Sequence, residues 1–155
     1  MKFDRFLYLK GRLLEELEAG GTVSENMELA DSLSLAYIGD VCYSLYWRNE
    51  VIKTGIEKVR VLHSFVAEIV SAKVQSVVYR AVKEQLSETE QMVAKRARNA
   101  NVHVPKSATV AEYRESTALE AVIGYLYISG QEERLNFLLR QCRTAVLDYM
   151  KAQEK

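Results

Sequence analysis

The sequence predicts an all-α fold in a single domain. Apolar residues return every three or four positions along most of the 155-residue chain, which is the period of an amphipathic helix. Only one proline, Pro105, interrupts this pattern. Two segments, Ser87–Glu90 and Thr109–Glu112, have the form of a capping box, in which a hydroxyl and a glutamate satisfy the free amides at the start of a helix. No segment shows a convincing strand pattern, and a chain of this length can build one core without disulfides or a structural metal.

The N-terminal half is expected to hold three helical stretches. The first runs from Phe3 to Leu17 and ends at a pair of glycines. The second runs from Leu33 to about Lys53. The third covers Val59 to Val82, and we expect it to break near Ser71 into two pieces.

The two capping boxes place the remaining helices. One helix is expected from Ser87 to about Asn99. Residues 100–108 contain Asn, His, Pro and Lys and lose the helical period, so they are expected to form a loop. A helix opening at Thr109 should end at Gly130, and a last helix should span Gln131 to about Lys151.

Composition excludes several classes of protein. With 48% hydrophobic and 27% charged residues, the chain is typical of globular domains rather than of disordered or fibrous ones. Cys42 and Cys142 lie in separate stretches without metal-ligand spacing, so we expect neither a disulfide nor a zinc site, which fits a reducing cytoplasm. No segment approaches the roughly 18 apolar residues of a membrane span, so secretion and membrane insertion are not expected.

Basic residues are unevenly distributed, although 21 Lys and Arg balance 21 Asp and Glu. The segment 91–111 contains no acid. Its basic and polar side chains include Lys95, Arg96, Arg98, Asn99, Asn101, His103 and Lys106. Cations are favoured at the C-terminus of any helix, but the same residue types also bind phosphate and ribose oxygens. The residues alone leave a solvated surface and a nucleic-acid contact equally open.

Two acidic residues lie on helix surfaces that are otherwise apolar or small. Asp40 follows a glycine, and Glu120 has Ser116, Thr117 and Gly124 three or four positions away, which would let another helix approach closely. If the two helices cross, their carboxylates would face each other and require a hard cation such as Mg²⁺. The alternative, which the spacing alone favours, is that each acid is solvated and paired with a nearby Arg or Lys.

Other catalytic motifs are missing from the sequence. There is no glycine-rich phosphate loop, no arranged serine or cysteine nucleophile and no cluster of histidines. His63 stands alone near the start of a helical stretch, where a surface or capping role is more common than general-base catalysis.

Several segments together resemble the ribonuclease III family. Leu35–Asp40 (LAYIGD) resembles the signature helix of its endonuclease domain, and Ser116–Tyr127 resembles its last catalytic helix. The ordered set LAYIGD, VSAKVQ, RARNA with VPKSA, and YRESTALEAVIGYLY is similar to Mini-ribonuclease III, the short form of the family without a double-stranded-RNA-binding domain. The resemblance covers about residues 33–128 and leaves residues 1–32 outside it.

This resemblance implies one ribonuclease III-type catalytic domain over residues 1–155, in which Asp40 and Glu120 are catalytic and bind Mg²⁺. Longer members of the family carry three further acids, at the positions that Leu33, Ala36 and Thr117 occupy here. A strongly held second metal ion is therefore not expected.

The resemblance also implies partners and a substrate. The family works as a homodimer, and Tyr37 matches an aromatic residue that inserts into the partner subunit. Double-stranded RNA would lie between the subunits and be cut on both strands, leaving 5′ phosphates. The natural substrate in this family is precursor 23S ribosomal RNA. The expected RNA-binding residues are Lys73, Lys95, Arg96, Arg98, Asn99, His103 and Lys106.

Two other functions stay open from the sequence. The missing acids are compatible with a non-catalytic double-stranded-RNA-binding protein or chaperone that uses the same basic segment. A different all-α metal hydrolase acting on nucleotides would also need carboxylates carried on helices.

Overall fold

The computed structural model describes residues 2–21 and 26–155 and confirms the predicted all-α fold, with no strand among these residues. The elements in chain order are α1 (Phe3–Glu18), η1 (Met27–Leu29), α2 (Ser32–Ile52), α3 (Val59–Ile69), α4 (Ala72–Val82), η2 (Lys83–Gln85), α5 (Glu88–Arg98), α6 (Val110–Ile128) and α7 (Glu132–Gln153). The predicted helices are all present, whereas the single turns η1 and η2 have no counterpart in the prediction.

Side-chain caps explain where the helices begin. Ser71 accepts a hydrogen bond from the amide of Val74 at 3.4 Å, so the predicted break between α3 and α4 falls at this residue. Both predicted capping boxes form, with Ser87 opening α5 and Thr109 opening α6. Asp31 accepts the amide of Ser34 at 2.8 Å and starts α2 one residue earlier than expected.

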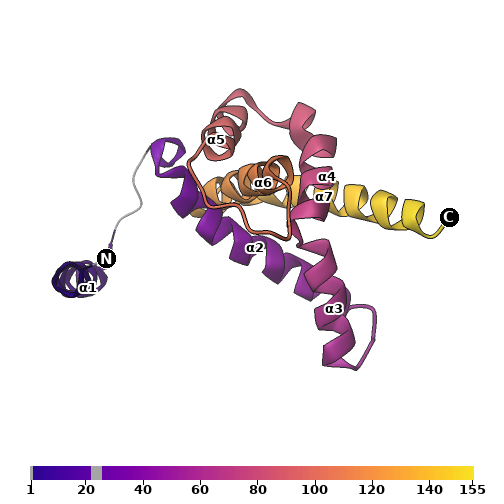
Figure 1. Cartoon of the computed structure of the whole chain (residues 1–155), viewed down its shortest axis with the longest axis horizontal. Coiled ribbons are helices and arrows are strands. Elements are labelled where there is room, and N and C mark those ends of the chain that lie inside the picture. The colour runs from indigo at the N-terminus through magenta and orange to yellow at the C-terminus, as the bar shows by residue number, and fades with distance from the viewer. Residues whose placement is uncertain (1, 22–25) are drawn as a thin grey trace.

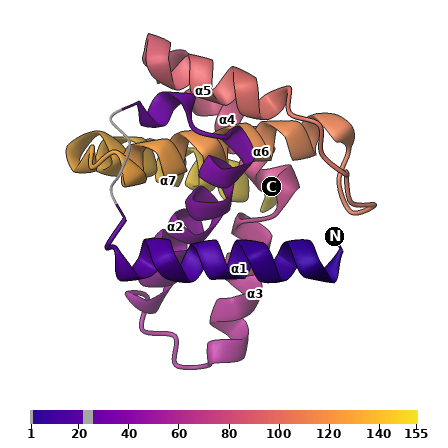
Figure 2. The same cartoon turned by 90° about the vertical axis from the view of Figure 1, so that its left-hand side faces the viewer.

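Helix α6 is the centre of the fold. Its middle stretch, from Ser116 to Leu126, is buried on nearly all sides. Figure 1 shows α2, α4 and α5 around α6, with α7 behind it, and Figure 2 shows the same arrangement from the side. A helix surrounded in this way has no polar face, which is why apolar and small residues fill this part of the sequence.

Helices α2 and α6 cross with their backbones in contact. A Cβ atom on Gly39 would overlap the carbonyl oxygen of Glu120 and lie 2.8 Å from the amide nitrogen of Gly124. A Cβ atom on Gly124 would overlap the carbonyl oxygen of Leu35. Only glycine fits at these two positions, and the crossing brings the residues beside them on the two helices close together.

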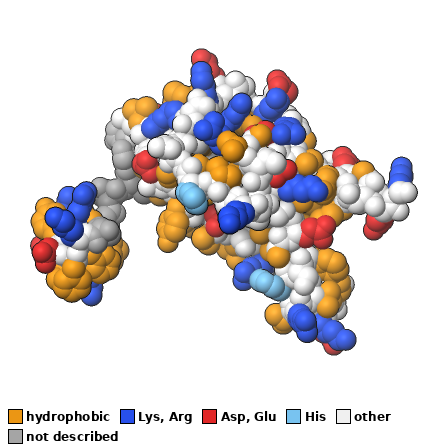
Figure 3. All heavy atoms as spheres, viewed as in Figure 1, with side chains coloured by type: hydrophobic (Ala, Val, Ile, Leu, Met, Phe, Trp, Pro, Cys, Tyr) orange, Lys and Arg blue, Asp and Glu red, His pale blue; other side chains and the backbone are white. Residues whose placement is uncertain are grey.

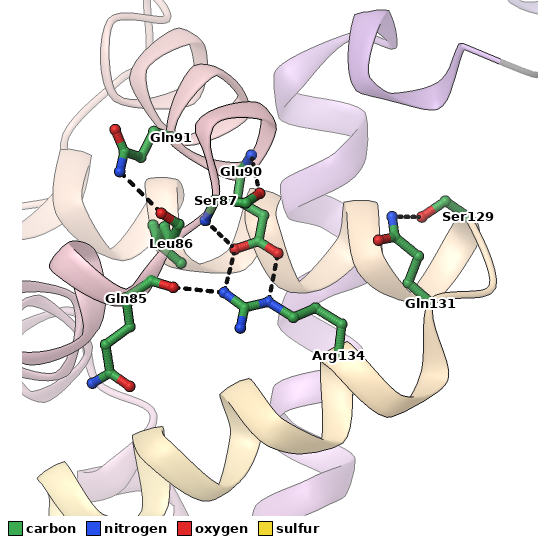
Figure 4. Close-up of polar contacts among 8 residues, drawn as sticks. All are labelled: Gln85, Leu86, Ser87, Glu90, Gln91, Ser129, Gln131 and Arg134. Atoms are coloured by element: carbon green, nitrogen blue, oxygen red, sulfur yellow. Dashed lines mark hydrogen bonds and ion pairs between the residues drawn. The ribbon is translucent and has the colours of Figure 1, made fainter.

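A buried ion pair ties the start of α5 to α7 (Figure 4). Glu90 is 2% exposed and accepts from Nε and Nη2 of Arg134 at 2.7 and 2.8 Å. Nη2 also donates to the carbonyl of Gln85 at 2.6 Å. Burial opposes ionisation of Glu90, but hydrogen bonds from Arg134 and Ser87 outweigh it and lower the pKa of the carboxyl below its ordinary 4.5. The pair therefore stabilises the fold above about pH 4.5 and loses this effect as the pH falls through the lowered pKa.

Helix α1 differs from the other helices because none of its residues is buried. Figure 1 shows it separated from the body formed by the remaining helices, and in Figure 2 it lies in front of that body. Within the described ranges, no single helix is both long and apolar enough to cross a membrane. Among these residues, only α3 taken together with residues 72–85 is long and apolar enough, and the axes of these two segments differ by 54°.

The glycine contact predicts a large effect of a single methyl group. We expect Gly124→Ala to lower the free energy of unfolding by about 2–3 kcal/mol, because the added Cβ pushes α2 away from α6. Urea denaturation measures this difference. Gly11→Ala is the matched control, since a Cβ on Gly11 meets no atom within 4 Å, and it should leave the transition of the body unchanged. Equal midpoints for Gly124→Ala and the parent protein would contradict this crossing.

Candidate active site

The crossing of α2 and α6 brings Asp40 and Glu120 together. Asp40 is exposed and follows Gly39 on α2, while Glu120 is partly buried on α6, where its own carbonyl contacts Gly39. Burial, and then the negative charge of Asp40, raise the pKa of the Glu120 carboxyl from 4.5 to about 7. Asp40 is therefore near enough for its charge to oppose ionisation of Glu120, in addition to the larger effect of burial.

Gln75 is a third member of this site that the sequence did not single out. It lies on α4, is 1% exposed, and donates from Nε2 to the carboxylate of Glu120 at 3.1 Å and to the carbonyl of Val70 at 2.9 Å. Its Oε1 is buried and has no hydrogen-bond partner within the described residues. The VSAKVQ segment contains Gln75, but a glutamine on an amphipathic helix carries no signal that its partner lies on another helix.

The donors of this site suit a hard divalent cation. Mg²⁺ is usually held by one or two carboxylates, with water and substrate phosphate completing its octahedron. Asp40 and Glu120 supply the carboxylates, and Gln75 donates from Nε2 to the carboxylate of Glu120. Nowhere in residues 2–21 and 26–155 do three His, Cys, Asp or Glu side chains converge as a metal-binding group. The residues therefore fit a cation shared with substrate rather than one enclosed by protein.

The positions that hold acids in longer members of the family are filled here without charge. Ala36 and Thr117 are 6% and 5% exposed. The hydroxyl of Thr117 donates to the carbonyl of Tyr113 at 2.9 Å, so it is already used within its own helix. Leu33 is exposed at the first turn of α2. Each of the two crossing helices thus contributes a single carboxylate to the site.

Three of the expected RNA-binding residues share one groove. Lys95, Arg98 and Asn99 line it together with Tyr79 and Lys83, between α4 and α5. Figure 3 shows basic side chains gathered over this part of the molecule. His103 and Lys106 are exposed in the loop between α5 and α6, and Lys73 is exposed near the start of α4, two positions before Gln75.

Arg96 makes contacts that the sequence did not indicate. Its guanidinium donates to the carbonyls of Glu28, Leu29 and Ala30 at 2.8, 3.4 and 3.3 Å. These bonds fasten η1, just before α2, to the last turn of α5. Arg96 therefore joins the backbone of residues 28–30 to α5. Its contact with RNA stays a prediction.

Tyr37 lies on the outer side of α2, where it is 80% exposed. Other exposed apolar side chains lie before and after it on α2 at intervals of four residues. Together they form the Tyr37 row: Leu33, Tyr37, Val41 and Leu45. Its spacing is that of one helix face, turned away from α6. His63, in contrast, lines an apolar groove between α2 and α3 that includes neither Asp40 nor Glu120.

Comparison with known proteins agrees with this geometry. Residues 33–131 match the Ribonuclease III domain family. The chain is 42% identical over 109 residues to Mini-ribonuclease 3 of Symbiobacterium thermophilum, covering 70% of this chain and 84% of that protein. It is 40% identical over 115 residues to Mini-ribonuclease 3 of Enterococcus faecalis, covering 72% and 87%. A crystal structure of a Fusobacterium nucleatum protein matches with a TM-score of 0.70 at 35% identity, covering 76% of this chain and 96% of that one.

The fold and the family match together define a ribonuclease III-type endoribonuclease. The chain belongs to the ribonuclease III family and, within it, to the Mini-ribonuclease III branch. The resemblance seen in the sequence motifs is thereby confirmed. Helix α1 precedes the residues that match the family.

The raised pKa of Glu120 predicts a stability that depends on pH. Because its folded pKa of about 7 exceeds 4.5, the unfolded chain loses this proton more readily, and stability falls as the pH rises through that window. In EDTA, Glu120→Gln should therefore unfold with a free energy on the order of 2 kcal/mol higher than the parent protein at pH 8 and about the same at pH 4.5. Urea denaturation at both pH values measures the difference. A constant difference at the two pH values would contradict a perturbed carboxyl.

Proposed function

We propose that this protein is a Mg²⁺-dependent endoribonuclease that cleaves double-stranded RNA. The observation that carries the proposal is the pairing of Asp40 and Glu120 at the α2–α6 crossing, where the pKa of Glu120 is raised to about 7. Such a pair is electrostatically unfavourable until a cation joins it. Membership of the ribonuclease III family supports the substrate class.

In this mechanism the protein positions the cation and the scissile phosphate. A bound Mg²⁺ would polarise the phosphodiester and lower the pKa of an attacking water. Asp40 and Glu120 would hold the ion from opposite helices, and Gln75 would keep Glu120 in place by donating to its carboxylate. The rigid glycine contact limits how far the two carboxylates can separate. The products would carry a 5′ phosphate and a 3′ hydroxyl.

RNA affinity would come from the basic groove and the loop that follows it. Double-stranded RNA is recognised through its backbone shape and 2′-hydroxyls more than through base edges. Lys95, Arg98 and Asn99 offer donors of the right kind in one groove. Lys73, His103 and Lys106 would extend this surface on either side, and all three are exposed.

We further propose that two copies act together. The Tyr37 row leaves apolar side chains exposed along the outer face of α2, which suits an isologous contact with a second copy. A homodimer would present one Asp40–Glu120 site to each strand of a duplex. The substrate proposed is the paired stem of precursor 23S ribosomal RNA. A cytoplasmic location agrees with both cysteines being free thiols.

The absence of the three further acids keeps one alternative in view. A non-catalytic double-stranded-RNA-binding protein or chaperone would retain the basic groove but not turn over substrate. The match to the ribonuclease III family argues against the third possibility, an unrelated nucleotide hydrolase.

The first test is cleavage of a long RNA duplex with Mg²⁺. We expect Asp40→Asn and Glu120→Gln each to reduce the rate by more than about 100-fold, since even residues that only support metal ligands can be worth 10–100-fold. Asp148→Asn, an exposed acid on α7, is the matched control and should cleave like the parent protein. Denaturing gel electrophoresis of timed samples, with an EDTA control, gives the rates.

Two other results would change the proposal. Cleavage that persists in either site variant would remove that residue from the active site. Binding of the duplex without cleavage by the parent protein would favour the chaperone alternative.

The different surroundings of Arg98 and Arg96 predict different effects of their removal. Arg98→Gln should weaken RNA binding and reduce the slope of log affinity against log salt by about 1, with stability unchanged. Arg96→Gln should lower the free energy of unfolding by about 1–2 kcal/mol, because three carbonyls lose their donor. Fluorescence anisotropy in EDTA at several salt concentrations and urea denaturation measure the two effects.

Lys151→Gln, at the far end of α7, is the control for loss of one positive charge. If Arg98→Gln and Lys151→Gln gave the same salt slope, the groove between α4 and α5 would not be the RNA contact.

A further inference from the structure

Helix α1 has an apolar face that nothing in the described structure covers. The side chains on this face are all at least 43% exposed. They are Phe3, Phe6, Leu7, Leu9, Leu13, Leu14 and Leu17, which share one half of the helix circumference. Seven exposed large apolar side chains on one face of a helix form the kind of patch that marks an interaction site. The helix lies outside residues 33–131, so the family match does not account for it.

The polar residues of α1 restrict what this partner can be. Within α1, acids outnumber basic residues by four to three. The basic residues, Arg5, Lys10 and Arg12, lie in its first three turns, and Lys10 falls within the apolar half. The last turns carry Glu15, Glu16 and Glu18, and the last turn contains no basic residue. A helix that binds a membrane surface typically has a polar face rich in Lys and Arg. The same acids would repel an RNA backbone. These features favour a protein surface that is apolar and has a basic residue at its edge.

The body of the protein offers such a surface around the end of α2. Two apolar grooves flank this end, one towards α3 and the other towards α6 and α7. Arg48 and Ile52 line both grooves, so the two form one continuous area. We call this area the α2 C-terminal surface, and its apolar lining includes Ile52, Val59, Leu62, Tyr127 and Leu139. Ile52 is 63% exposed there, although it is a large apolar side chain.

Chain geometry indicates that the occupant comes from a second copy. Helix α1 precedes the start of α2, whereas the α2 C-terminal surface lies at the other end of this 21-residue helix, about 30 Å away. When two copies meet through the Tyr37 row about an axis perpendicular to α2, the two helices run in opposite directions. The start of one α2 then lies near the end of the other, and α1 is delivered to the partner's grooves rather than to its own. This step rests on the dimer proposed above.

We propose that α1 is an arm that docks on the α2 C-terminal surface of a second copy of this chain. Its apolar face would fill the two grooves. The acids of its last turns would lie near Arg48 of the partner subunit, between the grooves. Burial of Leu13, Leu14 and Leu17 would supply most of the stabilisation, because exposed ion pairs contribute little. The arm would thus extend the dimer contact beyond the Tyr37 row.

Photo-crosslinking tests this docking directly. The crosslinking residue p-benzoylphenylalanine is placed at Leu14, on the apolar face, or at Tyr8, on the opposite side of α1, as the matched control. Irradiation of the full-length Leu14 protein should give a product of two chains, and peptide mapping should join α1 to α2, α3, α6 or α7 of the other chain. The Tyr8 protein should give at least about tenfold less of this product. Crosslinks from Leu14 within one chain, or to another part of the second chain, would overturn the proposal.

Sedimentation measurements separate failure of the arm from failure of the dimer. Leu17→Glu should raise the dimer dissociation constant at least about tenfold, and Tyr8→Glu should not change it. If the parent protein is a dimer and Leu17→Glu leaves its dissociation constant unchanged, the docking of α1 is refuted and the proposed dimer is not. If the parent protein sediments as a monomer at all concentrations, both the proposed dimer and the docking of α1 are refuted.

Discussion

The backbone contact between α2 and α6 at Gly39 and Gly124 is the constraint on which the rest of the structure depends. Any side chain larger than hydrogen at either position would separate the helices, because each missing Cβ is replaced by backbone atoms of the other helix. This contact buries the middle of α6 and places the chain at the start of α2 within reach of α5. It also aligns Asp40 and Glu120, since each lies beside or at the point of contact. Packing and the placement of the site therefore follow from the same two glycines.

Asp40 and Glu120 are held in an electrostatically unfavourable arrangement, which a bound cation would relieve. Burial and the charge of Asp40 both oppose ionisation of Glu120, while one hydrogen bond from Gln75 favours it. Among the described residues, no cationic side chain offsets this effect, because the side chain that donates to Glu120 is the neutral amide of Gln75. A protein selected for stability alone would place an apolar residue or a cationic partner here, as it does at Glu90, where Arg134 compensates burial. Glu90 is buried and compensated, whereas Glu120 is partly buried and is not, and this contrast supports the catalytic role proposed for Glu120.

The sequence predicted those features whose signals are local. The capping boxes of α5 and α6 and the break at Ser71 depend on residues three positions apart, and all three were predicted correctly. Asp40 and Glu120 are 80 residues apart in the sequence, and their proximity was predicted from the family resemblance and the small residues around Glu120. The sequence analysis did not single out Gln75, whose partner Glu120 lies 45 residues away. It gave Arg96 only an RNA-binding role, because the carbonyls that Arg96 contacts lie 66–68 residues away. Nothing in the pattern around a single glutamine or arginine identifies such a partner.

Helix α2 has two apolar sides, one buried in the core and the other exposed. One face carries Leu35, Gly39, Tyr43 and Trp47 into the core. The opposite side carries the Tyr37 row and continues into Ile52, so apolar residues surround most of the helix and its amphipathic signal is weak. A helix that is apolar all round is expected to be covered all round. The body covers only one side of α2, so the other side, like the apolar face of α1, requires a partner of matching character. In the arrangement proposed here, the Tyr37 row meets the same row of a second copy. The α2 C-terminal surface, which includes Arg48, then receives the acidic end of α1 from that copy.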